Sequence, residues 1–225
     1  LTKRSEGPQW WIRINPVGSH FHKDALHLIG VAEIHGIVLP KAEGGADVTQ
    51  LAHRTGNIPI HAIVTETAAS LFGLLSYRDP KSPLAAMSWG AEDLSAALGA
   101  SSKYDATGEL SFTYKLARSL CLASAVAAGV QPVDGVFADF KDEAGLRAEA
   151  EAARREGFTG KLAIHPAQVS VINAAFTPSD EEVRHAEEIV AAFEAQPNAG
   201  VLSVGGKMVD RPHLVQAQRV LERSR

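Results

Sequence analysis

The sequence predicts an α/β fold of the (β/α)8 barrel type, followed by a C-terminal helical extension. Short and nearly continuous apolar segments alternate with helical segments, a pattern typical of parallel strands covered on both faces. A polar residue also stands at or just after the end of each predicted strand, and a barrel gathers its functional groups at that rim. These strand-end residues are Arg13, Lys41, Glu66, Asp93, Asp139 and His165.

A doubly wound, nucleotide-binding sheet is the competing architecture. It loses support because the first strand–helix connections contain neither a G-x-G-x-x-G nor a P-loop sequence. A barrel needs eight strands, whereas six are predicted here. Because the chain also begins at Leu1 rather than at Met, we expect the first two barrel strands to lie before Leu1.

The predicted strands and helices are bounded by residues that end such elements. Pro16 ends the first strand because proline cannot donate a hydrogen bond to a ladder, and Gly157 is predicted to cap a helix. The predicted strands are 10–14, 36–39, 59–64, 84–89, 133–137 and 162–164. The predicted helices are 23–31, 46–55, 68–75, 93–98, 114–128 and 144–156.

The last part of the chain does not continue this alternation. We therefore predict a barrel domain over 1–176 and a C-terminal extension over 177–225. The first helix of the extension begins either at Thr177, with proline as its first helical residue, or at Ser179, with Glu182 completing a capping box.

The rest of the extension is predicted to contact another subunit. Gly205–Gly206 is interpreted as a flexible joint that leads to a final helix from about 213 to 223. One stripe of that helix is apolar and needs a surface to cover, which the next subunit of a ring would supply. The stripe consists of Leu214, Ala217, Val220 and Leu221.

The composition excludes some classes of protein. The net charge of −4 gives no reason to expect nucleic acid or an anionic membrane as partner. No apolar run approaches the ~20 residues that a membrane span needs. The single cysteine, Cys121, lies in an apolar helical stretch, where buried packing is its expected role. One thiol cannot form an internal disulfide, which fits the cytoplasmic location that we expect.

Two acidic residues follow successive apolar runs. Glu66 and Asp93 each precede a segment of small residues that is typical of a helix start. If the two runs are neighbouring parallel strands, both carboxylates lie at the same rim. Such a pair suits Mg²⁺ or Mn²⁺, which prefer oxygen ligands and keep several waters. The alternative is that each carboxylate stabilises a helix N-terminus, but the matching positions of the pair favour a metal.

Seven short motifs together resemble one known family. They are RINP (13–16), LPKAE (39–43), TETA (65–68), GAEDL (90–94), DGV (134–136), KLAIHP (161–166) and GKMVDRP (206–212). Their order and spacing are similar to those of the citrate lyase beta-subunit-like proteins. That family includes malyl-CoA and citramalyl-CoA lyases, within the superfamily of metal-dependent hydroxy-keto-acid aldolases. The resemblance implies a (β/α)8 barrel, commonly a trimer, whose first two strands precede the RINP strand.

The resemblance also implies roles for the matched residues. Glu66 and Asp93 would bind Mg²⁺, or Mn²⁺ in its place, with Glu66 also contacting substrate. Arg13 would be catalytic and would hold a substrate carboxylate or an enolate oxygen, which suits its planar fork. Asp210 would be catalytic in the next subunit, where it would serve proton transfer. The structural alternatives are a rim ion pair for Arg13 and a helix N-cap for Asp210.

Other polar residues near these motifs have simpler expected roles. Lys41 and Glu43 either orient the rim or form a salt bridge, and the salt bridge is favoured. His165 is expected to bond to the backbone rather than to act as a base. His20 and His22 are predicted to be surface loop residues.

The function that the resemblance implies is that of a Mg²⁺-dependent carbon–carbon lyase. It would cleave or form a hydroxydicarboxyl-CoA thioester, such as malyl-CoA, citramalyl-CoA or citryl-CoA, through an enolate. One alternative is an aldolase that uses free pyruvate and an aldehyde without CoA. Another is a non-catalytic member that binds CoA or a protein. The acyl group, and the choice among lyase, synthase and thioesterase, remain open at this point.

Overall fold

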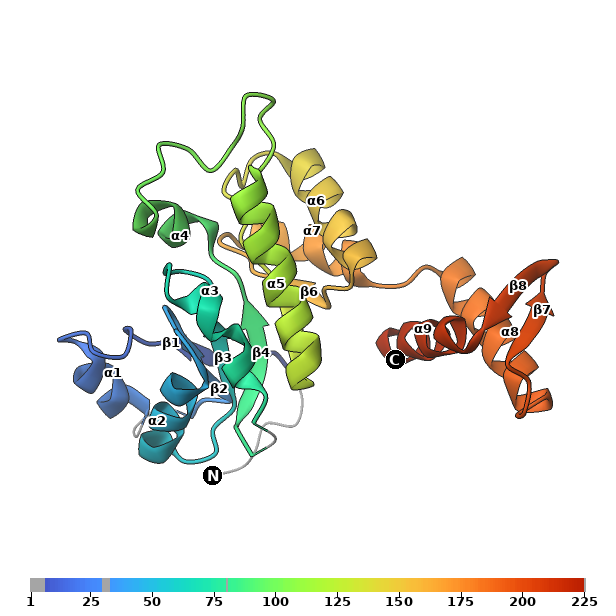
Figure 1. The fold of residues 1–225 in the computed structure, drawn as a ribbon, viewed down its shortest axis with the longest axis horizontal. Coiled ribbons are helices and arrows are strands. Elements are labelled where there is room, and N and C mark those ends of the chain that lie inside the picture. Colours follow the sequence, from blue (N-terminus) through green and yellow to red (C-terminus); the bar gives the residue numbers. More distant parts are fainter. Residues whose placement is uncertain (1–6, 30–32, 80, 225) are drawn as a thin grey trace.

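The computed structural model describes residues 7–29, 33–79 and 81–224. Its centre is a six-stranded parallel sheet in which the strands follow one another in chain order and which curls into an open half-barrel (Figure 1). The strands are β1 (Trp11–Arg13), β2 (Gly36–Leu39), β3 (Ile60–Ile63), β4 (Leu84–Ser88), β5 (Gln131–Asp134) and β6 (Gly160–Lys161). The predicted α/β class with a parallel sheet is therefore confirmed. The two strands expected before Leu1 lie outside the described residues.

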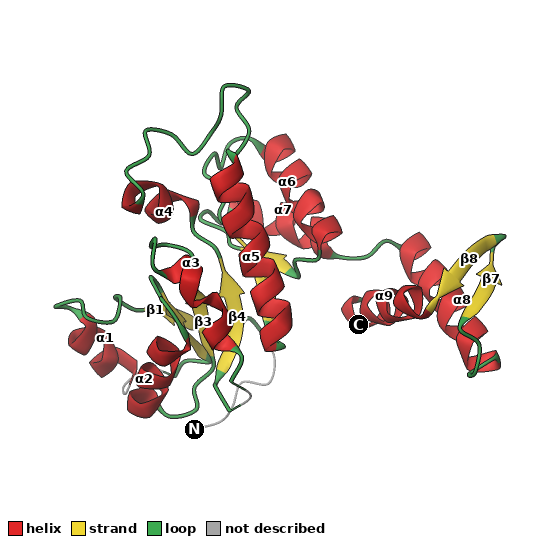
Figure 2. Cartoon of the chain, in the orientation of Figure 1, coloured by secondary structure: helices red, strands yellow, loops and turns green. Residues whose placement is uncertain are grey.

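At least one helix follows each strand of this sheet (Figure 2). These helices are α1 (His22–Ile29), α2 (Gly45–Thr55), α3 (Ser70–Gly73) with the 3₁₀ turn η1 (Leu74–Tyr77), α4 (Ala91–Ala97), α5 (Phe112–Ala128), α6 (Glu143–Glu156) and α7 (Ala167–Phe176). The main core forms where α2 and α5 pack apolar side chains against the sheet. Cys121 of α5 belongs to this core, and burial raises the pKa of its thiol to about 12, so its predicted packing role is confirmed.

Strands β5 and β6 lie about two residues earlier than predicted. The predicted strands began with the apolar residues Val133 and Leu162, whereas pairing in the sheet begins before them, at Gln131 and Gly160. Pro132 lies inside β5, where its carbonyl oxygen accepts a hydrogen bond of 2.8 Å from the N–H of Thr159. Strand β5 ends at the buried Asp134, whereas the predicted strand-end residue Asp139 is exposed in the following loop.

His22 also differs from its prediction. It begins α1 rather than lying in a surface loop, and only 5% of its surface is exposed. Its Nδ1 lies 3.0 Å from the carbonyl oxygen of Asn15, a partner that explains how the ring can be buried. His20 is exposed, as predicted.

The C-terminal extension forms a small unit of its own, at the right of Figures 1 and 2. It contains α8 (Asp180–Ala195), the antiparallel hairpin of β7 (Val201–Val204) and β8 (Lys207–Asp210), and α9 (Arg211–Arg223). Its core consists of Ala186, Ile189, Phe193, Val204, Val209 and Ala217. Ser179 and Glu182 form the capping box at the start of α8, which decides between the two predicted helix starts.

Gly205 and Gly206 are not a flexible joint. Val204 pairs with Lys207, so the two glycines are the whole loop of a β-hairpin. Their φ angles of 56° and 76° are both in the left-handed region, which a tight two-residue hairpin turn requires and glycine adopts most easily. The sequence was misinterpreted because the short strand after this turn was not predicted.

Among the residues that the structure describes, no helix is both long enough and apolar enough to cross a membrane.

Candidate active site

A cavity of about 250 Å³ lies at the carboxyl ends of the parallel strands. Its wall includes Arg13, the last residue of β1, and Glu66, which follows β3. Asp93 joins them from the first turn of α4, just after β4. Because β3 and β4 are parallel neighbours, the two carboxylates meet at one rim. Apolar side chains line much of the rest, among them Ile63, Trp89, Leu110, Val136, Leu162 and Ile164.

Glu66 is buried, with 6% of its surface exposed. Its Oε2 accepts a 2.5 Å hydrogen bond from the backbone N–H of Lys41. Burial raises the pKa of Glu66 to about 7, and the nearby carboxyl group of Asp93 adds to this effect, whereas the Lys41 N–H opposes it. Glu66 is therefore a buried acid whose negative charge is only partly compensated by the protein.

Gly90 allows Glu66 to occupy this position. A Cβ atom on Gly90 would lie 2.7 Å from the Cγ of Glu66, closer than side chains can approach. The Gly90 N–H also donates to Thr65 Oγ1 at 3.2 Å, which joins the ends of β3 and β4. The close approach of these two segments therefore depends on the absence of a side chain at Gly90.

Asp93 has a different environment. Its Oδ1 lies 2.9 Å from the ammonium nitrogen of Lys41, so the salt bridge predicted for Lys41 is present. For Glu43 the same prediction was wrong, because its carboxylate accepts a hydrogen bond from Thr67 instead. The hydrogen bond from Lys41 lowers the pKa of Asp93, and the charge of Arg13 acts in the same direction. Asp93 also lies in the first turn of α4, where negative charge is favourable. Helix stabilisation and metal binding are thus compatible at this residue.

The remaining predicted site residues lie elsewhere. His165 is exposed, stacks on Phe140 and accepts a 3.2 Å hydrogen bond from the N–H of Ala167, which confirms its bond to the backbone. Asp210 caps α9 in the C-terminal extension, where its Oδ1 lies 2.5 Å from Nδ1 of His213. Its alternative role as an N-cap is therefore present, and Asp210 does not line the cavity of its own chain.

A second buried acid, Asp134, contacts the cavity residue Trp89 and was missed in the sequence. The carboxylate of Asp134 accepts hydrogen bonds from Trp89 Nε1 at 2.7 Å and from Arg118 Nε at 2.8 Å. Lys161 donates to its other oxygen at 2.9 Å and also to Glu149 at 2.5 Å. Burial acts to raise the pKa of Asp134, but Lys161 and Arg118 outweigh it and hold the pKa below its usual value. Asp134 is thus a satisfied structural acid that supports Trp89.

A lysine in the loop after α4 was also missed. Lys103 lines the cavity, pairs with Glu92 and lies 5.0 Å from the ring centre of Tyr104. The sequence showed this segment only as a polar excursion, because nothing in it indicates which side chain faces the cavity.

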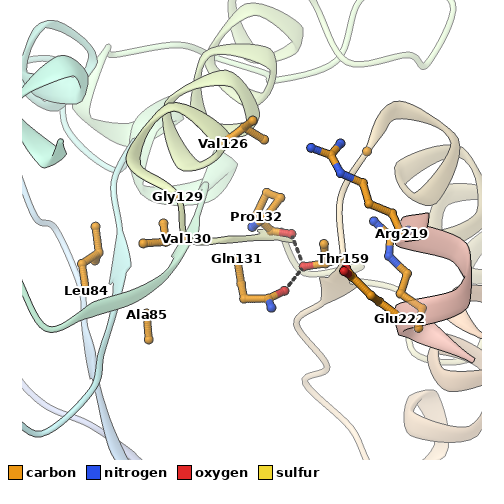
Figure 3. A pocket seen from close by; sticks show the side chains of 12 residues that line it. Leu84, Ala85, Val126, Gly129, Val130, Gln131, Pro132, Thr159, Arg219 and Glu222 are labelled. Atoms are coloured by element: carbon orange, nitrogen blue, oxygen red, sulfur yellow. Dashed lines mark hydrogen bonds between the residues drawn. The ribbon is translucent and has the colours of Figure 1, made fainter. Parts of the chain in front are cut away.

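A larger cavity, of about 710 Å³, lies at the opposite end of the sheet (Figure 3). It is bordered by the first residues of β4 and β5, Leu84 and Gln131, and by Arg219 and Glu222 of α9. Gln131 and Thr159 bond to each other at its edge, as Figure 3 shows. It brings no pair of carboxylates together, and parallel α/β sheets carry their ligand sites at the carboxyl ends of the strands, so the smaller cavity is the candidate active site.

The donor atoms of the smaller cavity fit one type of metal. Within the described residues, no group of three or more His, Cys, Asp and Glu side chains is placed to hold an ion. A zinc site generally needs three or four such ligands. Mg²⁺ is held by one or two carboxylates together with waters and substrate oxygens, and Glu66 and Asp93 offer that set.

Comparison with known proteins places this geometry in a family. The family model described as HpcH/HpaI aldolase/citrate lyase matches residues 4–166. The chain belongs to this family. It is 34% identical over 215 residues to the (3S)-malyl-CoA thioesterase of Cereibacter sphaeroides, an alignment covering 95% of this chain and 73% of that protein. It is also 34% identical to the mitochondrial citramalyl-CoA lyase of Rattus norvegicus, covering 93% of this chain and 67% of the relative.

A solved structure is similar over nearly the whole chain. It is the protein CitE of Mycobacterium tuberculosis in complex with magnesium, acetoacetate and coenzyme A, with a TM-score of 0.81 and 33% sequence identity. The similarity covers 95% of this chain and 77% of that chain. The resemblance inferred from the seven motifs is therefore confirmed, and so is the expectation that the fold is that of citrate lyase beta-like proteins.

Proposed function

We propose that this HpcH/HpaI-family protein is a Mg²⁺-dependent carbon–carbon lyase. Its substrate would be a hydroxydicarboxyl-CoA thioester, such as malyl-CoA, citramalyl-CoA or citryl-CoA, cleaved or formed through an enolate. One observation carries the proposal: Glu66, Asp93 and Arg13 line the same cavity at the carboxyl ends of the strands. The chain around this cavity belongs to the HpcH/HpaI family. Relatives named as a CoA-thioester lyase and a CoA thioesterase, and a similar structure with magnesium and coenzyme A, support it.

The residues of the cavity have distinct parts in this proposal. Glu66 and Asp93 would hold the divalent cation, which when bound would stabilise negative charge that develops on a substrate oxygen. Arg13 would bind a carboxylate or the enolate oxygen with its planar, permanently charged fork. The apolar wall around Trp89 would exclude water from the reacting carbon atoms.

The test is a panel assay with malyl-, citramalyl- and citryl-CoA, in Mg²⁺ and in EDTA. We expect Mg²⁺-dependent release of a keto acid and a shorter acyl-CoA from at least one substrate. Turnover of pyruvate with an aldehyde, and of no thioester, would support the aldolase alternative instead. Binding of CoA without any turnover would support a non-catalytic role.

Thioester hydrolysis is a second candidate activity, because one relative is named as a malyl-CoA thioesterase. The same assay separates the two activities. Hydrolysis releases free CoA, whose thiol reacts with a chromogenic disulfide, whereas carbon–carbon cleavage leaves the thioester bond intact.

We further propose that the chain assembles as a homotrimer or a higher ring in which the extension over 177–225 packs on a neighbouring subunit. Asp210 would then act in trans, in proton transfer at the neighbour's cavity. Support comes from the separate core of the extension and from the place of Asp210 at its β8–α9 junction. The helix stripe that was expected to need the neighbour's surface is instead covered within the extension, because Ala217 is buried in its core and Leu214, Val220 and Leu221 pack against that core.

Mixed oligomers test the trans role. Chains carrying Asp210→Asn and chains carrying Arg13→Ala should each be nearly inactive in a step that removes a proton from the acetyl-CoA methyl group. After subunit exchange, activity should partly return because some sites receive both intact residues. Absence of recovery, with exchange verified by mass spectrometry, would leave Asp210 with its helix-cap role alone.

Two finer expectations remain proposals. We propose that two further strands complete a (β/α)8 barrel in the whole protein, supported by the sequential order of the six parallel strands. We also propose a cytoplasmic location, supported by the single, buried cysteine.

A further inference from the structure

Lys41 has an unusual backbone conformation. Its φ of 53° makes it the one non-glycine residue with positive φ among the residues that the structure describes. This left-handed region is unfavourable for residues with a Cβ atom, and such strain persists where the surrounding structure enforces it. A glycine would adopt the same backbone more easily, so the lysine side chain at this position calls for an explanation.

Two contacts of Lys41 reach the two acids of the candidate active site. Its backbone N–H donates to Oε2 of Glu66 at 2.5 Å, and its ammonium group lies 2.9 Å from Oδ1 of Asp93. With its backbone in the left-handed region, this one residue makes both contacts. Lys41 therefore bridges the acid after β3 and the acid after β4 while belonging to the loop after β2.

The loop that carries Lys41 is held firmly against the segment that carries Glu66. The N–H of Ala42 donates to the carbonyl oxygen of Ile63 at 3.1 Å. On the other side, Thr67 Oγ1 donates to Glu43 at 2.7 Å. These bonds flank the Lys41–Glu66 contact, so the backbone of Lys41 is fixed relative to Glu66 whatever its side chain does.

We propose that Lys41 is a positioning residue with two separable parts: its backbone N–H orients Glu66 permanently, whereas its ammonium group occupies Asp93 until a divalent cation takes that carboxylate. The inference rests on the proposed metal site and says how this chain prepares it. The ammonium and the metal ion compete for the same carboxylate oxygens, so the ion pair lowers the apparent affinity for the cation.

The exposure of the pair supports such an exchange. The side chains of Lys41 and Asp93 are 43% and 46% exposed, so solvent screens their attraction and can receive the released ammonium. By contrast, the Lys161–Asp134 pair has no exposed side-chain surface, and its separation would leave two buried charges. Only the first pair can open at little cost.

The test measures Mg²⁺ affinity by isothermal titration calorimetry at low ionic strength. Lys41→Met removes the ammonium, and Lys41→Gly does so while favouring the same φ and keeping the backbone N–H. Both should bind Mg²⁺ roughly two- to fivefold more tightly than the unchanged protein, the range that an exposed ion pair contributes. Lys103→Met is the matched control, because it removes a cavity lysine that pairs with Glu92 rather than with Asp93. It should change the affinity less.

Unchanged or weaker affinity in both Lys41 variants would overturn the inference while leaving the metal site in place. Failure of the unchanged protein to bind Mg²⁺ would instead contradict the proposed metal site itself. A second measurement is made on the unchanged protein, and a variant serves only to assign the signal. After reductive ¹³C-methylation, the methyl resonance of Lys41, assigned by its loss in Lys41→Met, should shift when Mg²⁺ is added. A resonance that does not move would also overturn the exchange.

Discussion

Two buried acids, Glu66 just after β3 and Asp134 at the end of β5, have opposite electrostatic environments. Asp134 accepts hydrogen bonds from Trp89, Arg118 and Lys161, and its pKa is held below the usual value. Glu66 receives one backbone N–H and faces another carboxyl group, and its pKa is raised to about 7. The chain thus surrounds one acid with cationic partners and compensates the charge of the other only in part.

This difference in hydrogen-bond partners distinguishes a structural acid from one that is typical of a functional site. A buried carboxylate with three donors, two of them cationic, has its charge compensated within the protein, so removing one partner is costly. A buried carboxylate with an incomplete set of partners is typical of a functional site. Trp89 connects the two regions, because its indole N–H donates to Asp134 and the residue lines the cavity of Glu66.

The largest expected effect is on stability, at Asp134. Asp134→Asn keeps the size of the side chain but leaves the charges of Lys161 and Arg118 without their shared partner. We expect a loss of about 3–5 kcal/mol in the free energy of unfolding, measured by urea denaturation. Asp139→Asn, at an exposed acid of the following loop, should stay within about 0.5 kcal/mol. Equal losses in the free energy of unfolding for the two substitutions would contradict the structural role of Asp134.

The next effect is on activity, at Glu66. Glu66→Gln should lower Mg²⁺-dependent kcat by roughly 10²–10³-fold, the range for loss of one electrostatic contribution to a transition state. Asp93→Asn should act in the same direction. Both variants should remain folded by circular dichroism. Near-normal turnover by either variant would show that its acid does not bind the metal.

A smaller effect is expected on the pH dependence of the free energy of unfolding, which should differ between the two acids. The folded-state pKa of Glu66 lies above its unfolded value near 4.5, so its contribution to stability is present below pH 4.5 and is lost as pH rises to about 7. In EDTA, Glu66→Gln should therefore be stabilising relative to the unchanged protein at pH 7.5 by about 1–2 kcal/mol, after allowance for screening, and close to neutral at pH 4.5.

Asp134 has the opposite sign. Its folded-state pKa is lowered, so its stabilisation is present above its ordinary pKa near 3.8 and is lost as pH falls below it. The cost of Asp134→Asn should accordingly shrink on acidification. Parallel pH profiles for the two variants, measured by urea denaturation, would contradict the contrast between the two acids.

The smallest effect is expected at His165, which follows β6 at the same rim. Its ring is exposed and stacks on Phe140. His165→Ala should change the free energy of unfolding by no more than about 0.5 kcal/mol and leave Mg²⁺ dependence intact. A large fall in kcat would add His165 to the site.

The pairing of Glu66 with Asp93 could be predicted because it depends on local patterns. Each acid follows an apolar run, and the carboxyl ends of neighbouring parallel strands share one rim. The environment of Asp134 could not be predicted in this way. Its partners Arg118 and Lys161 come from other elements, and the predicted strand 133–137 ran past Asp134, where β5 ends. Asp134 and Lys161 each lie inside a recognised motif, which was the available signal. Their ion pair, and with it the burial of Lys161, becomes apparent only when the two strands are placed side by side.

Other differences have similar physical causes. The hairpin at Gly205–Gly206 was missed because β8 is short and only its pairing with β7 identifies it as a strand. His22 was taken for a surface residue because its carbonyl partner on Asn15 cannot be inferred from sequence. The left-handed backbone of Lys41 likewise could not be predicted from its residue type, because it accompanies contacts with Glu66 and Asp93 that are distant in the sequence.

The most direct test of the account is the number of Mn²⁺ ions bound per chain, counted by electron paramagnetic resonance with Mn²⁺ as a substitute for Mg²⁺. We predict one ion for the unchanged protein, none for Glu66→Gln at the same concentrations, and one for Glu149→Gln, a control at another acid of the cavity wall. One bound ion in Glu66→Gln, with unchanged affinity, would contradict the claim that the incompletely compensated acid is the metal ligand.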